Sequence, residues 1–165
     1  MVGEKPRIIQ FESAHLQSVL DLSIRAWGPV FPHMAAEIPL FVYNAFYPDG
    51  WEVRQRKDVE AMCVHDKATH VWVAMLADQV AGFVGLRVHA EDRMGEVHII
   101  AVDPAFQRRG VGRALLDFSF DWFREQLLSM VMVETGGDTG HAPSRATYEA
   151  AGFLRYPVAR YFRQL

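Results

Sequence analysis

The chain has a single cysteine, Cys63, among its 165 residues, and this scarcity excludes an internal disulfide framework. It also has no block of one charge: 17 basic residues stand against 20 acidic ones, a formal net charge of -3. Nonspecific binding to nucleic acid or to an anionic membrane is therefore not expected.

No apolar run approaches the roughly 20 residues of a membrane-spanning helix, and the N-terminus lacks the apolar core of a signal peptide. A cytoplasmic protein is predicted. The seven histidines show no metal-ligand spacing, so no metal is expected.

Apolar periodicity predicts an α+β fold. The pattern favours a strand over 7–11, a helix over 12–26, a helix over 52–65, and an antiparallel meander of strands over 70–77, 79–90 and 93–102. Prolines and aromatic residues crowd the segment 27–51, which favours short helices and turns. A helix over about 110–128, a strand over 130–135, a second helix and a tail strand over 158–162 complete the order. We expect a mixed central sheet of about six to seven strands flanked by helices.

The most informative run joins the strand over 93–102 to the helix that follows it. It reads Gln107-Arg108-Arg109-Gly110-Val111-Gly112-Arg113 and follows Val102-Asp103-Pro104 after two intervening residues. Glycines let a backbone approach an anion closely, and the first turn of a helix leaves several N–H groups without internal partners. Neither the Gly-Lys-Ser/Thr loop of nucleotide triphosphatases nor the three spaced glycines of dinucleotide sites is present. On its own, this run is also compatible with an ordinary strand-to-helix turn.

A second motif lies near the C-terminus. Pro143 suits the first turn of a helix, and Gly152 suits the position just past its end. Between them the chain reads Ser144-Arg145-Ala146-Thr147-Tyr148-Glu149 and continues to Gly152-Phe153. The glycine-rich stretch 136–140 before this helix has the composition of a turn.

Together the two runs resemble motifs A and B of the GCN5-related N-acetyltransferases (GNAT). The resemblance covers nearly the whole chain and implies a single acetyltransferase domain over residues 1–165, with a cleft where the strand over 93–102 and the strand over 130–135 splay apart. It implies acetyl-CoA as the cosubstrate and a small-molecule or peptide amine as the acceptor, by direct attack in a ternary complex. Family members often form homodimers. The acceptor itself is not identified by the sequence.

The resemblance also implies roles for particular residues. Backbone groups of residues 108–112 would hold the pyrophosphate, with positive charge from three arginines, and the end of the strand would hold the pantetheine arm. Ser144 belongs to the same site, and His141 stands where many members have an asparagine that binds this arm, so it either replaces that asparagine or caps the helix. The cofactor-binding residues expected on this basis are Ile100, Ala101, Val102, Gln107, Arg108, Arg109, Gly110, Val111, Gly112, Arg113, His141 and Ser144.

Two catalytic residues are expected. Tyr148 matches the tyrosine assigned as general acid to the leaving thiolate, and a phenol with a pKa of about 10 stays protonated at neutral pH; packing alone is the alternative. Glu96 lies eleven residues before Gln107, at the offset of a glutamate general base. His98 is an alternative base on the same strand face, and a water chain is another.

Three further alternatives concern the chain as a whole. The aromatic segment 27–51 either selects the acceptor or only covers the core. A non-catalytic acyl-CoA-binding domain, acting as a sensor or scaffold, would keep the same glycine loop. An α+β interaction module would bind no phosphate there.

Overall fold

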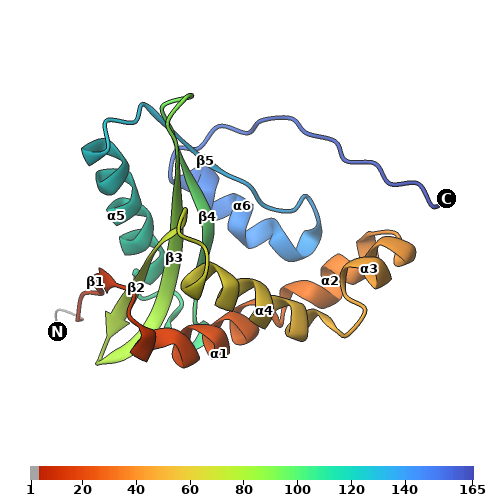
Figure 1. The fold of residues 1–165 in the computed structure, drawn as a ribbon, viewed down its shortest axis with the longest axis horizontal. Helices are drawn as coiled ribbons and strands as arrows, with labels where there is room; N and C mark the ends of the chain where they lie inside the picture. The colour runs from red at the N-terminus through yellow and green to blue at the C-terminus, as the bar shows by residue number, and fades with distance from the viewer. Residues whose placement is uncertain (1–3) are drawn as a thin grey trace.

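The computed structural model describes residues 4–165 and consists of a five-stranded mixed sheet with helices on both faces (Figure 1). The elements follow one another along the chain as β1 (Arg7–Gln10), a 3-10 turn (Ser13–His15), α1 (Leu16–Trp27), α2 (Val30–Glu37), α3 (Leu40–Phe46), α4 (Trp51–Val64), β2 (His70–Leu76), β3 (Gln79–His89), β4 (Met94–Val102), a 3-10 turn (Pro104–Phe106), α5 (Val111–Glu125), β5 (Met130–Val133), a 3-10 turn (Thr139–His141) and α6 (Ala142–Ala150). The predicted α+β class and the predicted meander are confirmed.

The sheet has the order β1-β2-β3-β4-β5. Its first four strands pair antiparallel, and β5 pairs parallel to β4. Parallel pairing needs a crossover connection, and α5 provides it.

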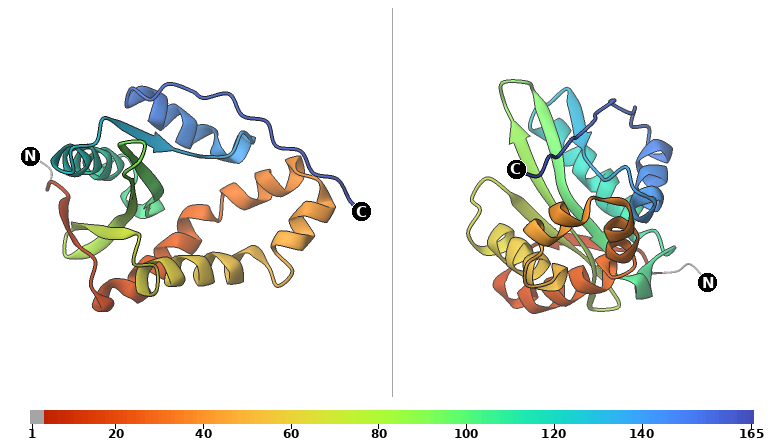
Figure 2. Two further views of the ribbon diagram at one scale, coloured as in Figure 1. Left: turned by 45° about the horizontal axis from the view of Figure 1, so that its top comes forward. Right: turned by 90° about the vertical axis from the view of Figure 1, so that its right-hand side faces the viewer.

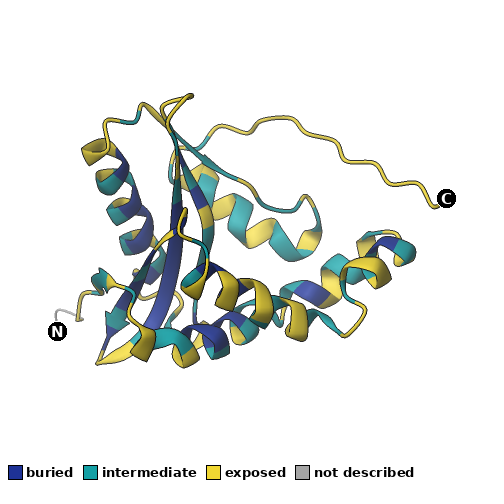
Figure 3. Ribbon diagram, in the orientation of Figure 1, coloured by how far each residue is buried: buried dark blue, intermediate teal, exposed yellow. Residues whose placement is uncertain are grey.

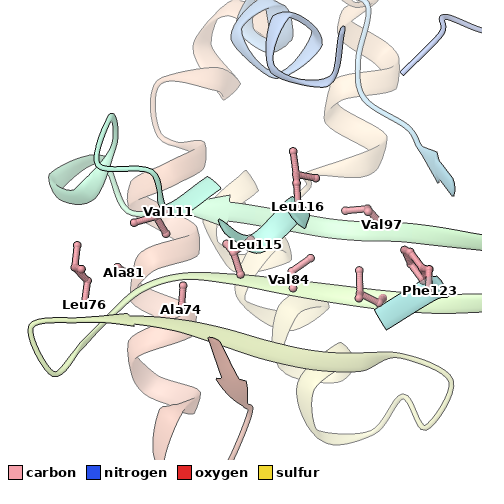
Figure 4. Packing of buried hydrophobic residues seen from close by; sticks show 10 residues of the cluster. Ala74, Leu76, Ala81, Val84, Val97, Val111, Leu115, Leu116 and Phe123 are labelled. Carbon is pink, nitrogen blue, oxygen red and sulfur yellow. The ribbon is translucent and has the colours of Figure 1, made fainter. Parts of the chain in front are cut away.

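Two hydrophobic layers hold the helices to the sheet. On one face, α5 packs Val111, Leu115, Leu116 and Phe123 against β2, β3 and β4 (Figure 4). On the other face, α1 and α4 pack against the same three strands, mainly through Val19, Leu22, Val59 and Met62. The two views of Figure 2 show the sheet between these helix layers, with α2 and α3 extending away from it. Apolar residues three and four positions apart on α5 give it one continuous buried stripe, as the sequence predicted.

Strand β4 carries an irregularity that matters for the site. Val97 opposes Leu86 of β3 and Ile99 opposes Gly85, so His98 has no partner residue on β3. This is a bulge of one residue, which leaves the extra residue outside the regular ladder. Val97 packs in the α5 layer, whereas Ile99 packs in the α1/α4 layer.

The predicted tail strand is wrong. Residues 151–165 form no strand, so the sheet has five strands and not the expected six to seven. The tail runs as an extended segment towards α3 and is almost wholly exposed (Figure 3). Strand propensity reflects a side chain fitting a half-buried pleated surface. Here Tyr156, Val158 and Tyr161 find no such surface, and each is at least 79% exposed. Phe162 contacts α3: the centre of its ring lies 5.8 Å from the centre of the Phe46 ring.

Candidate active site

A cleft opens where β4 and β5 part. The two strands are paired from Met94 and Met130 to Val97 and Val133, where β5 ends, whereas β4 continues to Val102. Beyond that point lies a cleft of about 300 Å³. The residues that line it are Ala26, Trp27, Val30, Val97, His98, Ile99, Ile100, Ala101, Val102, Gln107, Val133, Glu134, Thr135, His141, Ser144 and Tyr148.

The side chain of Asp103 holds the loop between β4 and α5 in place. This carboxylate is buried, accepts hydrogen bonds from Arg25 Nε at 3.0 Å and from a terminal nitrogen of Arg25 at 2.5 Å, and also accepts the backbone N–H of Ala105 at 2.9 Å. Arg25 comes from α1, so this ion pair joins the loop to the opposite face of the sheet. The Val-Asp-Pro sequence thus has a local structural role.

The loop ends in an open anion-binding geometry. Arg108 and Gly110 both have left-handed backbone conformations, with φ of +62° and +80°. The first helical bond of α5 runs from the N–H of Ala114 to the carbonyl of Gly110, and no side chain caps the helix. The three amides between them therefore lack helical partners and can bind an anion.

The glycines of the loop have open surroundings. A Cβ built on Gly110 would meet no atom within 4 Å, and one on Gly112 would come only to 3.5 Å from Val102. A side chain at either position would therefore fill empty space in front of the loop without clashing with the protein. The backbone of Val111 belongs to this cradle, although its side chain is buried in the core.

The three loop arginines differ in their contacts. Arg113 donates from Nε to both carboxylate oxygens of Asp117, at 3.0 and 2.9 Å, and the guanidinium of Arg109 lies 5.3 Å from the ring centre of Phe106. Arg108 is exposed. Arg109, Gly110 and Arg113 line a second hollow of about 570 Å³ beside the loop, together with Lys5. Glu4 and Asp117 line the same hollow, so basic and acidic side chains stand together at this rim.

One face of α6 forms the facing wall of the cleft. His141, Ser144 and Tyr148 lie three and seven positions apart, a spacing that places them on the same helix face, and all three line the cleft. Burial raises the pKa of Tyr148 to about 12. The phenol therefore keeps its proton throughout the neutral range and can act only as a donor of that proton.

Glu96 lies in the part of β4 that is still paired with β5 and does not itself line the cleft. Its Oε1 is 3.0 Å from His98 Nδ1, and its Oε2 is 2.6 Å from His89 Nε2. Burial acts to raise the pKa of Glu96, but the hydrogen bonds from His89 and His98 outweigh it, so that the pKa is lowered overall. The structure thus places His98 at the cleft and Glu96 behind it.

A second carboxylate–imidazole pair occurs at the start of α6. Asp138 Oδ2 lies 2.6 Å from His141 Nδ1, and Asp138 Oδ1 accepts the backbone N–H of His141 at 3.2 Å. His141 lines the cleft and occupies the N-cap position of α6, but its side chain makes no capping hydrogen bond to the helix, so the expected capping role is not seen. The sequence analysis treated Asp138 only as a turn residue. Its spacing of three from a histidine at a helix start is the signal that could have identified it.

Other expected and unexpected residues complete the site. Ile100, Ala101, Val102 and Gln107 line the cleft as predicted. Trp27 and Val30, from the end of α1 and the start of α2, also line the cleft, so the segment 27–51 reaches the cleft at its beginning.

Residues 4–165 contain neither a metal-binding cluster nor a membrane-spanning helix. No group of three or more histidine, cysteine, aspartate or glutamate side chains is arranged to hold a metal ion. In the same range, no helix is both long and apolar enough to cross a bilayer.

Comparison with known proteins identifies the family. The family model described as the Acetyltransferase (GNAT) family matches residues 37–153, and the chain belongs to this family. Over 85 residues it is 35% identical to a mycothiol acetyltransferase of Rhodococcus erythropolis, a match that covers 49% of this chain and 28% of that protein. The chain thus matches only about a quarter of the length of the curated relatives it aligns with first.

Solved structures confirm the fold. A GNAT acetyltransferase from Desulfovibrio desulfuricans superposes with a TM-score of 0.67 at 22% identity, covering 93% of this chain and 87% of the other. The enzyme AAC(6')-Iy, solved with a bisubstrate analogue built from CoA and acetylneamine, superposes with a TM-score of 0.64 at 16% identity, covering 98% and 99%.

Proposed function

We propose that this chain is an acetyl-CoA-dependent N-acetyltransferase that acetylates a primary amine by direct attack in a ternary complex. One observation carries the proposal: an imidazole, His98, and a phenol, Tyr148, line one cleft, and Gln107 at the start of the glycine loop lines the same cleft. Residues 1–165 would act as one catalytic domain in the cytoplasm. Family membership and the CoA-based ligand of a structural neighbour support acetyl-CoA as the cosubstrate.

The residues divide the reaction between them. The amides of 111–113 and the nearby arginines would bind the pyrophosphate, and the free edge of β4 at residues 100–102 would hold the pantetheine arm. The deprotonated amine nitrogen attacks the thioester carbonyl carbon, the C–S bond breaks, and the thiolate takes the proton of Tyr148. The second proton that the nitrogen loses on becoming an amide returns to the Tyr148 oxygen. The ammonium proton passes to His98, which Glu96 orients through Nδ1. One proton is released overall.

The bulge supplies a reason for placing the acetyl group near His98. A residue outside the ladder has backbone groups free of β3, and an N–H in that position can polarise a thioester carbonyl. A mere acyl-CoA sensor would need neither the phenol nor the oriented imidazole. The mycothiol and aminoglycoside acetyltransferases among the similar proteins favour a small-molecule amine as the acceptor.

Donor binding is tested by replacing the glycine with the most open surroundings. Gly110→Asp keeps a residue that tolerates a left-handed backbone but places a carboxylate in the phosphate space. We expect calorimetry to show acetyl-CoA binding lost while the melting temperature stays close to that of the wild type. Unchanged affinity would refute the assignment of the loop.

Catalysis is tested by following CoA thiol release with a panel of primary amines and by comparing Tyr148→Phe with the wild type. Loss of the general acid is expected to lower kcat by about a hundredfold, whereas the KM for acetyl-CoA stays unchanged. If Tyr148→Phe has the kcat of the wild type, Tyr148 has only a packing role and is not the general acid. If no amine in the panel releases thiol, the proposal of catalysis fails.

A further inference from the structure

Asp138 is a nearly buried carboxylate that stands behind His141, a residue that lines the cleft. Its side chain is 9% exposed, and its ion pair is with His141, itself 17% exposed. Arg145 lies close by but donates to the backbone carbonyls of Gly136 and Asp138, at 2.6 and 2.7 Å, and not to the carboxylate. Within residues 4–165, no lysine or arginine forms an ion pair with Asp138. Because a buried charge is costly without a counter-charge, this wall favours a cation.

The hydrogen bond to Asp138 also determines which ring nitrogen of His141 is left without a partner. An ionised Asp138 can only accept hydrogen bonds, so Nδ1 of His141 carries a proton, and in the neutral form of the ring Nε2 would present a lone pair. Among the described residues, Nε2 has no hydrogen-bond partner, and every fully buried polar side-chain atom does have one. Nε2 is therefore accessible, on a residue that lines the cleft.

Close packing and hydrogen bonds hold the loop that carries Asp138 and His141 in place. A Cβ on Gly136 would clash with Asp138 and His141, and a Cβ on Gly140 would come within 2.6 Å of the carbonyl oxygen of Val30. Glu37 of α2 accepts hydrogen bonds from both the N–H and the hydroxyl of Thr139. The loop is thus wedged against α2, beside the aromatic segment that borders the acceptor side.

We propose that Asp138 and His141 form the subsite for the ammonium group of the acceptor. An N–H of the ammonium would donate to His141 Nε2, and the carboxylate of Asp138 would balance its positive charge. No covalent bond changes in this step. The subsite selects cationic amines that carry an N–H, and His98 on the β4 wall then receives the proton. The inference deepens the proposed function and rests on it.

The test uses a ligand that needs no turnover. Long-range proton–nitrogen NMR of the histidine rings is recorded with propylammonium at millimolar concentration, in the presence of CoA. Tetramethylammonium is the matched control, because it has the same charge but no N–H. We expect propylammonium to shift the Nε2 resonance of His141 and tetramethylammonium to leave it in place. Equal shifts with both ions, or none with either, would overturn the proposal.

Variants separate the subsite from donor binding and from a structural role. Asp138→Asn and His141→Ala are each expected to weaken propylammonium binding at least tenfold and to raise the KM of the best amine substrate, whereas kcat changes less. Their acetyl-CoA affinity and backbone NMR spectra should match the wild type. A loss of acetyl-CoA affinity, or a fall in kcat alone, would assign His141 to the pantetheine arm or to proton transfer and refute the subsite. A wild type that shows the propylammonium-specific shift but releases no thiol would refute the enzyme and not the subsite.

Discussion

The two carboxylate–imidazole pairs of the cleft use the same chemistry on different scaffolds. Glu96 and His98 lie two residues apart on β4, where the alternation of a strand places both side chains on one face. Asp138 and His141 lie three residues apart at a helix start, in a loop that depends on close-packed glycines. Strand geometry provides the first pair without special residues, whereas the second requires Gly136, Gly140, Glu37 and Arg145.

The pairs also differ in how the carboxylate is shared. Glu96 serves two imidazoles, His89 and His98, and lies behind the cleft. Asp138 serves one imidazole and is more deeply buried. A shared carboxylate is suited to orienting a proton acceptor, and an unshared buried one is suited to attracting a cation. This difference supports our proposal that the β4 pair takes part in proton transfer and the loop pair in binding the acceptor.

The largest expected effect breaks the loop pair while leaving the strand pair intact. In Gly136→Ala, the new Cβ would lie 2.6 Å from His141 Nδ1 and closer still to Asp138, so the loop must shift. We expect kcat/KM for the amine to fall by about a hundredfold, because a displacement of this size misplaces the acceptor. Gly137→Ala is the control, since its Cβ would meet no atom within 4 Å. Equal activities of the two variants would show that the loop geometry has no part in acceptor use.

A smaller effect is expected from the strand pair. Glu96→Gln removes the charge that orients His98, and we expect kcat to fall by about tenfold with little change in the KM for the amine. His89→Gln is the control: it removes the other hydrogen bond of Glu96, and we expect kcat to stay within about twofold because partly exposed pairs contribute little. Steady-state kinetics of both variants measures the difference. A larger loss of kcat in His89→Gln than in Glu96→Gln would contradict the proposed role of Glu96 in orienting His98.

The smallest effect concerns acid stability. At both carboxyls burial acts to raise the pKa, but imidazole hydrogen bonds outweigh it, so the pKa values of Glu96 and Asp138 in the folded state lie below the ordinary 4.5 and 3.8. Each therefore stabilises the fold fully above its ordinary pKa, and this contribution is lost as pH falls through the lowered value. Between pH 7 and pH 3, Glu96→Gln or Asp138→Asn should lose about 2 to 4 °C less in Tm than the wild type. If the Tm of each variant falls with pH as steeply as the Tm of the wild type, the lowered pKa values of Glu96 and Asp138 are contradicted.

Much of the fold followed from local patterns in the sequence. The stripe of Val111, Leu115 and Phe118 predicted α5, and Gly152 marked the end of α6, because helix period and caps are local properties. The glycine loop at Gly110 was predicted for the same reason: a left-handed backbone at that point is a property of the residue.

The features that escaped prediction depend on distant contacts. The tail at Val158 has strand-like residues but no surface to pair with, and only the folded sheet determines that. The bulge at His98 depends on the register of β3. The role of Asp138 depends on how α2 holds the loop through Glu37, which is about a hundred positions away in sequence.

The bulge in β4 has a consequence for how this site can evolve. Before it, the strand faces the α5 layer with Val97; after it, Ile99 faces the α1/α4 layer. His98 sits at the junction of these two phases and belongs to neither hydrophobic layer. The strand can therefore carry a polar side chain at the cleft without interrupting the packing of either hydrophobic layer, and selection can act on this position without a matching change in the core.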